Sequence, residues 1–129
     1  MNGSPATADQ RFIQEGSGWR LGWDTTAPHY RGLLAGDTWA IELTETEFFV
    51  FRRLVVEIDA TIEAIAAELA DSERVTCEAE ADGLWLEIDG FPHAYSLRFI
   101  LLSNRRCEGE WDAVAAQELV QAVHHLALF

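Results

Sequence analysis

The side chains best suited to chemistry in this sequence are four histidines, two cysteines and many carboxylates. His124 and His125 are adjacent, so on a helix they point about 100° apart and do not share a metal as an i, i+4 pair does. His29 and His93 fall in two separate segments that favour loops. We therefore expect surface or hydrogen-bonding histidines, with no metal and no cofactor.

The sequence contains no recognisable motif for nucleophilic or acid–base catalysis. The sequence has no Gly-x-Ser-x-Gly elbow, no phosphate loop and no His-Glu-x-x-His helix, and neither Cys77 nor Cys107 lies beside a histidine. Glu78 and Glu87 support acid–base work only if they are buried together, and we expect them to be solvated. The sequence thus predicts a protein that is not an enzyme, with two free thiols in a reducing cytoplasm.

Charge is the most lopsided property of the chain. Nine basic residues, all Arg, face 22 acidic ones, which gives a net charge of −13 over 129 residues. The stretch 57–82 alone holds nine acids and one base, Arg74. Such a charge repels nucleic-acid backbones and anionic membranes, so we expect neither as a partner. The acidic block is interpreted as a solvated face or as a surface for a basic protein.

The first half of the chain reads as strands followed by a helix. Residues 1–17 are rich in Gly, Ser and Ala, and we expect a flexible lead-in to one domain over 18–129. Apolar residues alternate over 19–23 and again over 39–43, which indicates strands. Thr44 and Glu47 have the spacing of a capping box, so a helix should begin there and run to about Ala70. Its apolar seam is Phe48, Phe51, Val55, Ile58, Ile62, Ile65 and Leu69. That seam suits burial against a sheet or, alternatively, pairing with a second chain.

The second half repeats that plan. Asp82-Gly83 predicts a tight hairpin between 74–81 and 84–88. A loop over 89–93, a central strand over 95–102 covered on both faces, and a polar turn over 104–109 should follow. Asp112 is a suitable N-cap for a last helix. No signal peptide follows Met1 and no 18-residue apolar run occurs, so we expect a cytoplasmic protein without membrane insertion. The fold class is α+β, with antiparallel strands and two helices in a tandem strand–helix, strand–helix order.

The hairpin register assigns one tryptophan a different role from the others. Trp19, Trp23 and Trp39 lie on apolar strand faces and should enter the core. Trp85 falls on the opposite, acidic face with Glu78, Glu80 and Glu87, because positions facing each other across the turn sum to 165. Trp85 there either covers a helix or serves as an exposed anchor for a partner. We take these four residues as the candidate binding site.

A second candidate surface involves Arg20, Arg31 and Arg98, which lie near aromatic residues in the sequence. Basic groups interleaved with aromatic rings are typical of single-stranded nucleic-acid binders. Nine Arg spread over the whole chain make such a stripe thin. Nucleic-acid binding is therefore the alternative hypothesis rather than the leading one.

Four segments together resemble a small cyanobacterial family of uncharacterised proteins, classed as a domain of unknown function. They are 15–23, 39–44, 77–80 and 90–97, with the sequences Glu-Gly-Ser-Gly-Trp-Arg-Leu-Gly-Trp, Trp-Ala-Ile-Glu-Leu-Thr, Cys-Glu-Ala-Glu and Gly-Phe-Pro-His-Ala-Tyr-Ser-Leu. The resemblance covers about 15–126. It implies a fold like that of the Whirly and transcriptional-coactivator single-strand-binding domains, with two strand–helix motifs in one chain, and a cyanobacterial cytoplasm. It implies no activity.

The leading functional hypothesis is a non-enzymatic interaction or assembly module that binds a protein partner, as a monomer or homodimer. A small-ligand or enzymatic domain is a further alternative, and it requires a polar pocket between the sheet and the helices.

Overall fold

The computed structural model describes residues 10–70, 72–103 and 105–126. Four strands and a helix are followed by four more strands and a second helix. The elements are β1 (Arg11–Gly16), β2 (Trp19–Asp24), β3 (Gly32–Ala35), β4 (Ala40–Leu43), α1 (Glu45–Ala66), β5 (Val75–Ala81), β6 (Leu84–Phe91), β7 (Ala94–Leu101), β8 (Cys107–Trp111) and α2 (Ala113–His124). The α+β class and the tandem order of strands and helices are confirmed.

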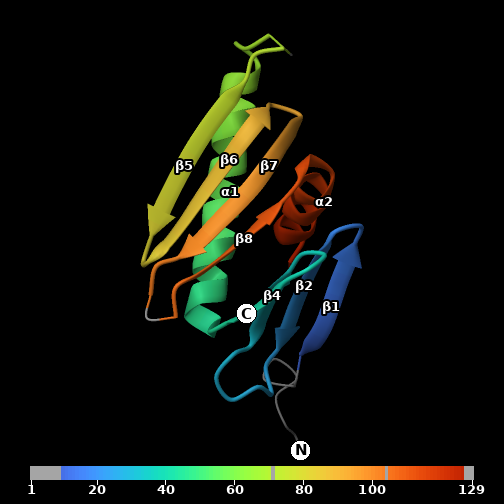
Figure 1. The fold of residues 1–129 in the computed structure, drawn as a ribbon, viewed down its shortest axis with the longest axis vertical. Coiled ribbons are helices and arrows are strands. Elements are labelled where there is room, and N and C mark those ends of the chain that lie inside the picture. The colour runs from blue at the N-terminus through green and yellow to red at the C-terminus, as the bar shows by residue number, and fades with distance from the viewer. Residues whose placement is uncertain (1–9, 71, 104, 127–129) are drawn as a thin grey trace, which may run out of the picture.

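The strands form two separate antiparallel sheets, each ordered as in the chain: β1-β2-β3-β4 and β5-β6-β7-β8. Figure 1 shows the long helix α1 crossing behind the second sheet, with α2 beside it toward the first sheet. Both helices contact strands of both sheets. The core therefore lies between the helices and the inner faces of the two sheets. Among the described residues, no helix is both long and apolar enough to cross a lipid bilayer.

The predicted capping box begins α1. The Thr44 hydroxyl accepts from the Glu47 N–H at 3.2 Å, and the Glu47 carboxylate accepts from the Thr44 N–H at 2.9 Å. The apolar seam from Phe48 to Ile62 is buried within this chain. The helix ends at Ala66 rather than Ala70, because the next residues form turns with i→i+3 hydrogen bonds. Burial against the sheets thus explains most of the seam.

The second hairpin has the predicted register. Glu78 faces Glu87, Glu80 faces Trp85, and Asp82 and Gly83 both adopt positive φ (50° and 82°), as a two-residue turn of the I′ type requires. The expected loop over 89–93 is wrong. Strand β6 continues to Phe91 because Asp89 still pairs with Thr76 on one side and Ser96 on the other, and only Pro92 and His93 turn the chain.

Two strands were missed by the sequence analysis. The expected lead-in over 1–17 is wrong for Arg11–Gly16, which form β1 and pair with β2; residues 1–9 lie outside the described residues. Only Phe12 of this strand packs against the core, so no alternation marks it. The turn expected over 104–109 is wrong from Cys107 onward, where β8 begins.

Gly109 explains why β8 was mistaken for a turn. Glycine usually weakens a strand, but here it faces Phe99 across the ladder and is buried. A Cβ at this position would lie 2.4 Å from the Trp39 ring, so the glycine makes room for the tryptophan. The expectation for the adjoining strand also changes: β7 is buried on one face only, while Ser96, Arg98 and Ile100 on the other are half-exposed.

The core is built around aromatic rings that join both halves. Trp111 lies 5.1 Å from Trp39 and stacks on Phe99 at 5.5 Å, measured between ring centroids. Trp19 and Trp23 are buried as expected, and Trp39 is half-buried. Trp19 also donates its indole N–H to Glu118 of α2 at 2.8 Å. These rings fix the second sheet against the helices and leave its outer face to solvent.

Candidate functional site

The outer face of the second sheet collects the predicted binding residues. Side chains directly opposite each other in a ladder lie on the same face. Trp85 has Glu80 on one side and Ile100 on the other, and Glu87 lies between Glu78 and Arg98. Trp85, Glu78, Glu80 and Glu87 therefore form one continuous surface, which we call the acidic sheet face. Its carboxylates are Glu78, Glu80, Glu87, Asp89, Glu108 and Glu110.

Trp85 is half-exposed on this face, opposite to the side on which the helices pack. Its indole N–H donates to the Glu78 carboxylate at 3.2 Å, a diagonal contact between β6 and β5. The Arg98 guanidinium lies 5.5 Å from the centroid of the Trp85 ring, within the range of a cation–π contact. The ring is thus held between an acid and a base while part of it stays open to solvent.

The face has more negative than positive groups. Arg74 pairs with Asp89 at 2.7 Å, and Arg98 lies 3.6 Å from Glu108. Hydrogen bonds from Arg74 and Thr76 hold the pKa of Asp89 below its ordinary value. No ion pair among the described residues involves the remaining acids, Glu78, Glu80, Glu87 and Glu110. A cationic partner would meet these four without displacing a guanidinium group.

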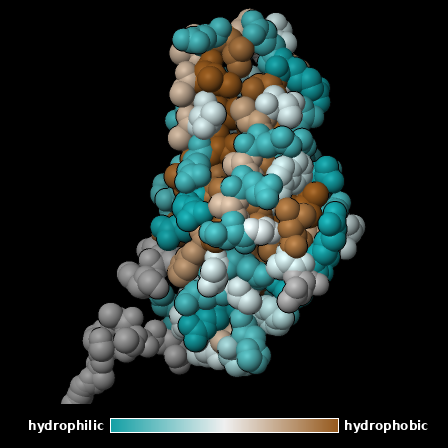
Figure 2. Space-filling view, turned by 90° about the vertical axis from the view of Figure 1, so that its left-hand side faces the viewer, coloured by the Kyte–Doolittle hydropathy of each residue, from teal (hydrophilic) through white to brown (hydrophobic). Residues whose placement is uncertain are grey.

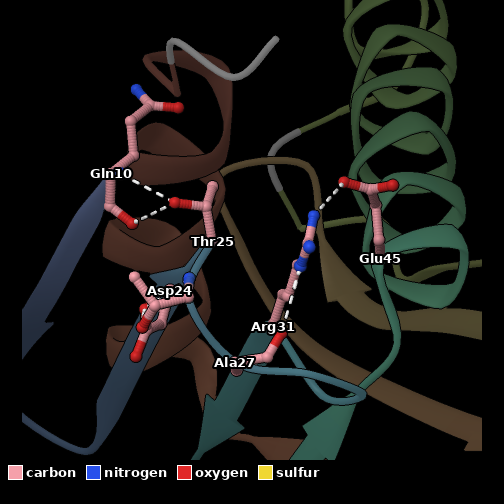
Figure 3. A network of polar contacts seen from close by, with 7 residues as sticks. Gln10, Asp24, Thr25, Ala27, Arg31 and Glu45 are labelled. Atoms are coloured by element: carbon pink, nitrogen blue, oxygen red, sulfur yellow. Dashed lines mark hydrogen bonds and ion pairs between the residues drawn. The ribbon is translucent and has the colours of Figure 1, made fainter. Parts of the chain in front are cut away.

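The candidate nucleic-acid residues are not brought together. Arg20 is exposed on β2 of the first sheet, and Arg98 lies among the carboxylates of the second. Arg31, in the loop before β3, donates to the Ala27 carbonyl at 3.2 Å and to Glu45 at 3.3 Å, as Figure 3 shows. The three guanidinium groups therefore form no common stripe.

Half of the acidic sheet face lies outside the strands that the sequence predicts. Glu108 falls in the turn expected over 104–109 and Asp89 in the loop expected over 89–93, and no strand is predicted at Glu110, whereas the structure places all three on β6 and β8. The alternation in Cys107-Glu-Gly-Glu-Trp111 was the available signal, since its inward positions are half-buried or buried and its outward positions are both Glu. The alternation is hard to recognise because Gly109, at an inward position, has no apolar side chain.

A polar cavity of about 150 Å³, also missed, lies on the other side of the sheet, between α1, α2 and the β6–β7 turn. At its wall, Tyr95 donates to one oxygen of Asp59 at 2.8 Å, and the Nε2 of His124 lies 2.9 Å from the other. Burial and the bond to Asp59 raise the pKa of Tyr95, so its hydroxyl stays protonated. These groups are 36 and 65 positions from Asp59 in the chain, so no local pattern reveals them.

A third surface feature is apolar. Figure 2 shows a broken hydrophobic strip along the side of the molecule on which β5 and α1 lie. The inward residues of β5 are only half-buried, because β5 is the terminal strand of its sheet. They are Val75, Cys77, Ala79 and Ala81. Nothing in their geometry specifies one kind of partner.

Comparison with known proteins places the chain in a family. The model of the family described as "Domain of unknown function (DUF1818)" matches residues 14–126. No curated protein matches the chain. The fold is similar to the crystal structure of a protein with unknown function, described as from the DUF155 family, of the cyanobacterium Prochlorococcus sp. NATL2A. The two chains share 28% identity over 88% of this chain and 96% of the other, with a TM-score of 0.83. Because the family model spans most of its length, this chain belongs to the DUF1818 family.

Proposed function

We propose that the protein is a non-enzymatic docking module and that its acidic sheet face binds a basic segment of a protein partner. The observation that carries the proposal is the position of Trp85. A half-exposed indole lies near one end of a sheet surface whose charged groups are mostly carboxylates. A buried aromatic anchor with a charged rim is the arrangement that dominates many protein interfaces.

Charge complementarity specifies the partner as basic. Six carboxylates and two guanidinium groups, Arg74 and Arg98, share this face. An arginine or lysine side chain can stack on the indole, as Arg98 does within the chain, while its neighbours bind the surrounding acids. The contribution of exposed ion pairs decreases with salt, so the complex should be salt-sensitive.

The thiols support the non-enzymatic part of the proposal. Cys77 and Cys107 are free, and burial raises the pKa of the Cys107 thiol, which disfavours the reactive thiolate. A cytoplasmic location, where such thiols stay reduced, belongs to the same proposal. The repeated order of four strands and one helix also supports the proposal of a Whirly-type fold. Fold likeness does not carry nucleic-acid binding with it, because that needs a basic surface.

The test is a titration of the full chain with an arginine-rich peptide and, separately, with a single-stranded oligonucleotide, each at low and at physiological salt. We expect saturable binding of the peptide, followed by Trp fluorescence, and no response to the oligonucleotide. Trp85→Ala should weaken peptide binding about tenfold or more, as expected of an interface anchor.

A matched pair of charge variants identifies the face. The triple variant Glu78→Gln, Glu80→Gln, Glu87→Gln removes three charges from the acidic sheet face. The control Glu57→Gln, Glu68→Gln, Glu73→Gln removes three from exposed positions elsewhere. Peptide binding should fail in the first and persist in the second. Equal weakening in both would show general attraction to a chain of charge −13 and would refute the docking face.

A further inference from the structure

The polar cavity beneath the second sheet has two walls of different chemistry. Asp59 and Glu63 are four residues apart on α1 and so lie on one side of that helix, and both line the cavity. Gln117 and Gln121 have the same spacing on α2 and line the opposite wall. Tyr95 of β7 also lines it, and His93 belongs to the turn at its edge. Two carboxylates thus face two amides across a space open to solvent.

Asp59 is the more buried of the two carboxylates in these walls. Only 15% of its side chain is exposed, and Tyr95 and His124 together supply one contact to each of its oxygens. A carboxylate offers about four lone-pair sites, so the two contacts leave acceptor capacity. Tyr95 has already given its single proton to Asp59. Asp59 and Glu63 therefore give the cavity negative charge, while the amides of Gln117 and Gln121 offer both donors and acceptors.

Two carboxylates with free acceptor sites favour a ligand that is positively charged and rich in N–H donors. The volume of about 150 Å³ equals that of a protein cavity known to admit benzene, which sets the ligand at roughly six non-hydrogen atoms. We propose that this cavity binds a small organic cation, an alkylguanidinium or alkylammonium group, between the carboxylates of α1 and the amides of α2.

This site is independent of the acidic sheet face. Tyr95 and Gly90 face each other on the inner side of the sheet, whereas Trp85 lies on the outer side. Loss of peptide binding at the acidic sheet face therefore leaves cation binding in the cavity intact, and the reverse also holds. Trp85→Ala should accordingly leave cation binding in the cavity unchanged.

The test uses methylguanidinium and its neutral isostere methylurea, added to the full chain at constant ionic strength. The side-chain amide signals of Gln117 and Gln121 in ¹H–¹⁵N NMR spectra report occupancy. We expect saturable shifts with methylguanidinium below roughly 10 mM, a range typical of fragments, and none with methylurea. Equal shifts with both probes, or none with either, overturn the proposal.

Three variants test which carboxylates bind the cation. Asp59→Asn keeps an acceptor for Tyr95 and should weaken methylguanidinium binding about tenfold or more, because it removes a largely buried charge. Glu63→Gln, at an exposed position, should weaken it roughly three- to fivefold. Glu68→Gln removes an exposed charge nearby that does not line the cavity, and should change binding less than about twofold. A Glu68→Gln effect equal to that of Glu63→Gln would overturn the assignment.

The cation can be a free metabolite or the side chain of a protein. A short peptide with one central arginine, blocked at both ends, separates the two sources. Tighter binding than that of methylguanidinium identifies a protein side chain as the ligand. Equal or weaker binding identifies a free small molecule, and both results retain the cation site.

Discussion

Trp111 of β8 donates its indole N–H to the main-chain oxygen of Ala35 in β3 at 3.0 Å, and this buried hydrogen bond joins the two sheets. The same indole stacks on Phe99 and contacts Trp39. One side chain therefore makes both the hydrogen bond and the aromatic contacts that join the two sheets. The two halves of the chain are thereby held in one core.

Trp111→Phe tests that junction. The variant keeps an aromatic ring but leaves the Ala35 carbonyl without its donor and a small cavity beside Phe99. We expect the free energy of unfolding to fall by about 2–4 kcal/mol in urea denaturation followed by circular dichroism. Trp85→Phe, at the half-exposed position, should change it by less than about 1 kcal/mol. Equal losses would show that the buried hydrogen bond is not the cause.

Substituting two glycines by alanine distinguishes the cost of backbone strain from the cost of a steric clash. Gly83 has φ +82° and open space around its missing Cβ, whereas Gly90 has φ +146° and a Cβ there would lie 2.6 Å from the Ala94 oxygen. Gly83→Ala should cost about 1–2 kcal/mol of unfolding free energy, from left-handed strain alone. Gly90→Ala should cost at least roughly 2 kcal/mol more, because main chain must move. The reverse ranking in urea denaturation would contradict the geometry.

Thr44 and Thr46 provide a matched test of the capping box. Thr44→Ala removes the hydroxyl that accepts from Glu47, and should lower the free energy of unfolding by about 1 kcal/mol. Thr46→Ala, within the first turn and exposed, should leave it unchanged or slightly raised, because Ala has the higher helix propensity. Thermal unfolding of both variants alongside the parent chain measures the difference.

Tyr95 should make the protein sensitive to alkali. Its pKa is raised by burial and by Asp59, so the folded protein keeps a proton that the unfolded chain releases near pH 10. The stabilising effect is complete below that pH and declines as pH rises above it, by about 1.4 kcal/mol per unit. Tyr95→Phe has no such proton, so its stability deficit relative to the parent should narrow above about pH 10. A deficit that stays constant from pH 9 to pH 11 would count against this prediction.

Short-range patterns predicted much of the fold. The Asp82-Gly83 turn specified which residues of β5 and β6 face each other, and so placed Trp85, Glu78, Glu80 and Glu87 on one surface. The start of each helix followed from Thr44 and Asp112, whose side chains accept backbone hydrogen bonds within a single turn. In both cases the physical cause lies within about ten residues of the chain.

The missed features have causes that lie far away in the chain. Gly109 belongs in a strand because Trp39, 70 positions earlier, occupies the space beside it. Arg11–Gly16 form a strand because β2 supplies hydrogen bonds, while Phe12 is the residue of this strand that packs against the core. The Asp59 network needs three elements in place at once. Such long-range contacts produce no pattern in the spacing of residues along the sequence.

The acidic sheet face also affects how copies of this chain meet one another. β5 is the terminal strand of its sheet, with hydrogen-bonding groups along its outer edge, and such edges invite a neighbouring molecule to add its own strand. Two copies joined through β5 would bring Glu78 and Glu80 of each to within about 5 Å of like charges. Mutual repulsion then opposes sheet extension into fibres, so the charges that attract a basic partner also protect the molecule from self-aggregation.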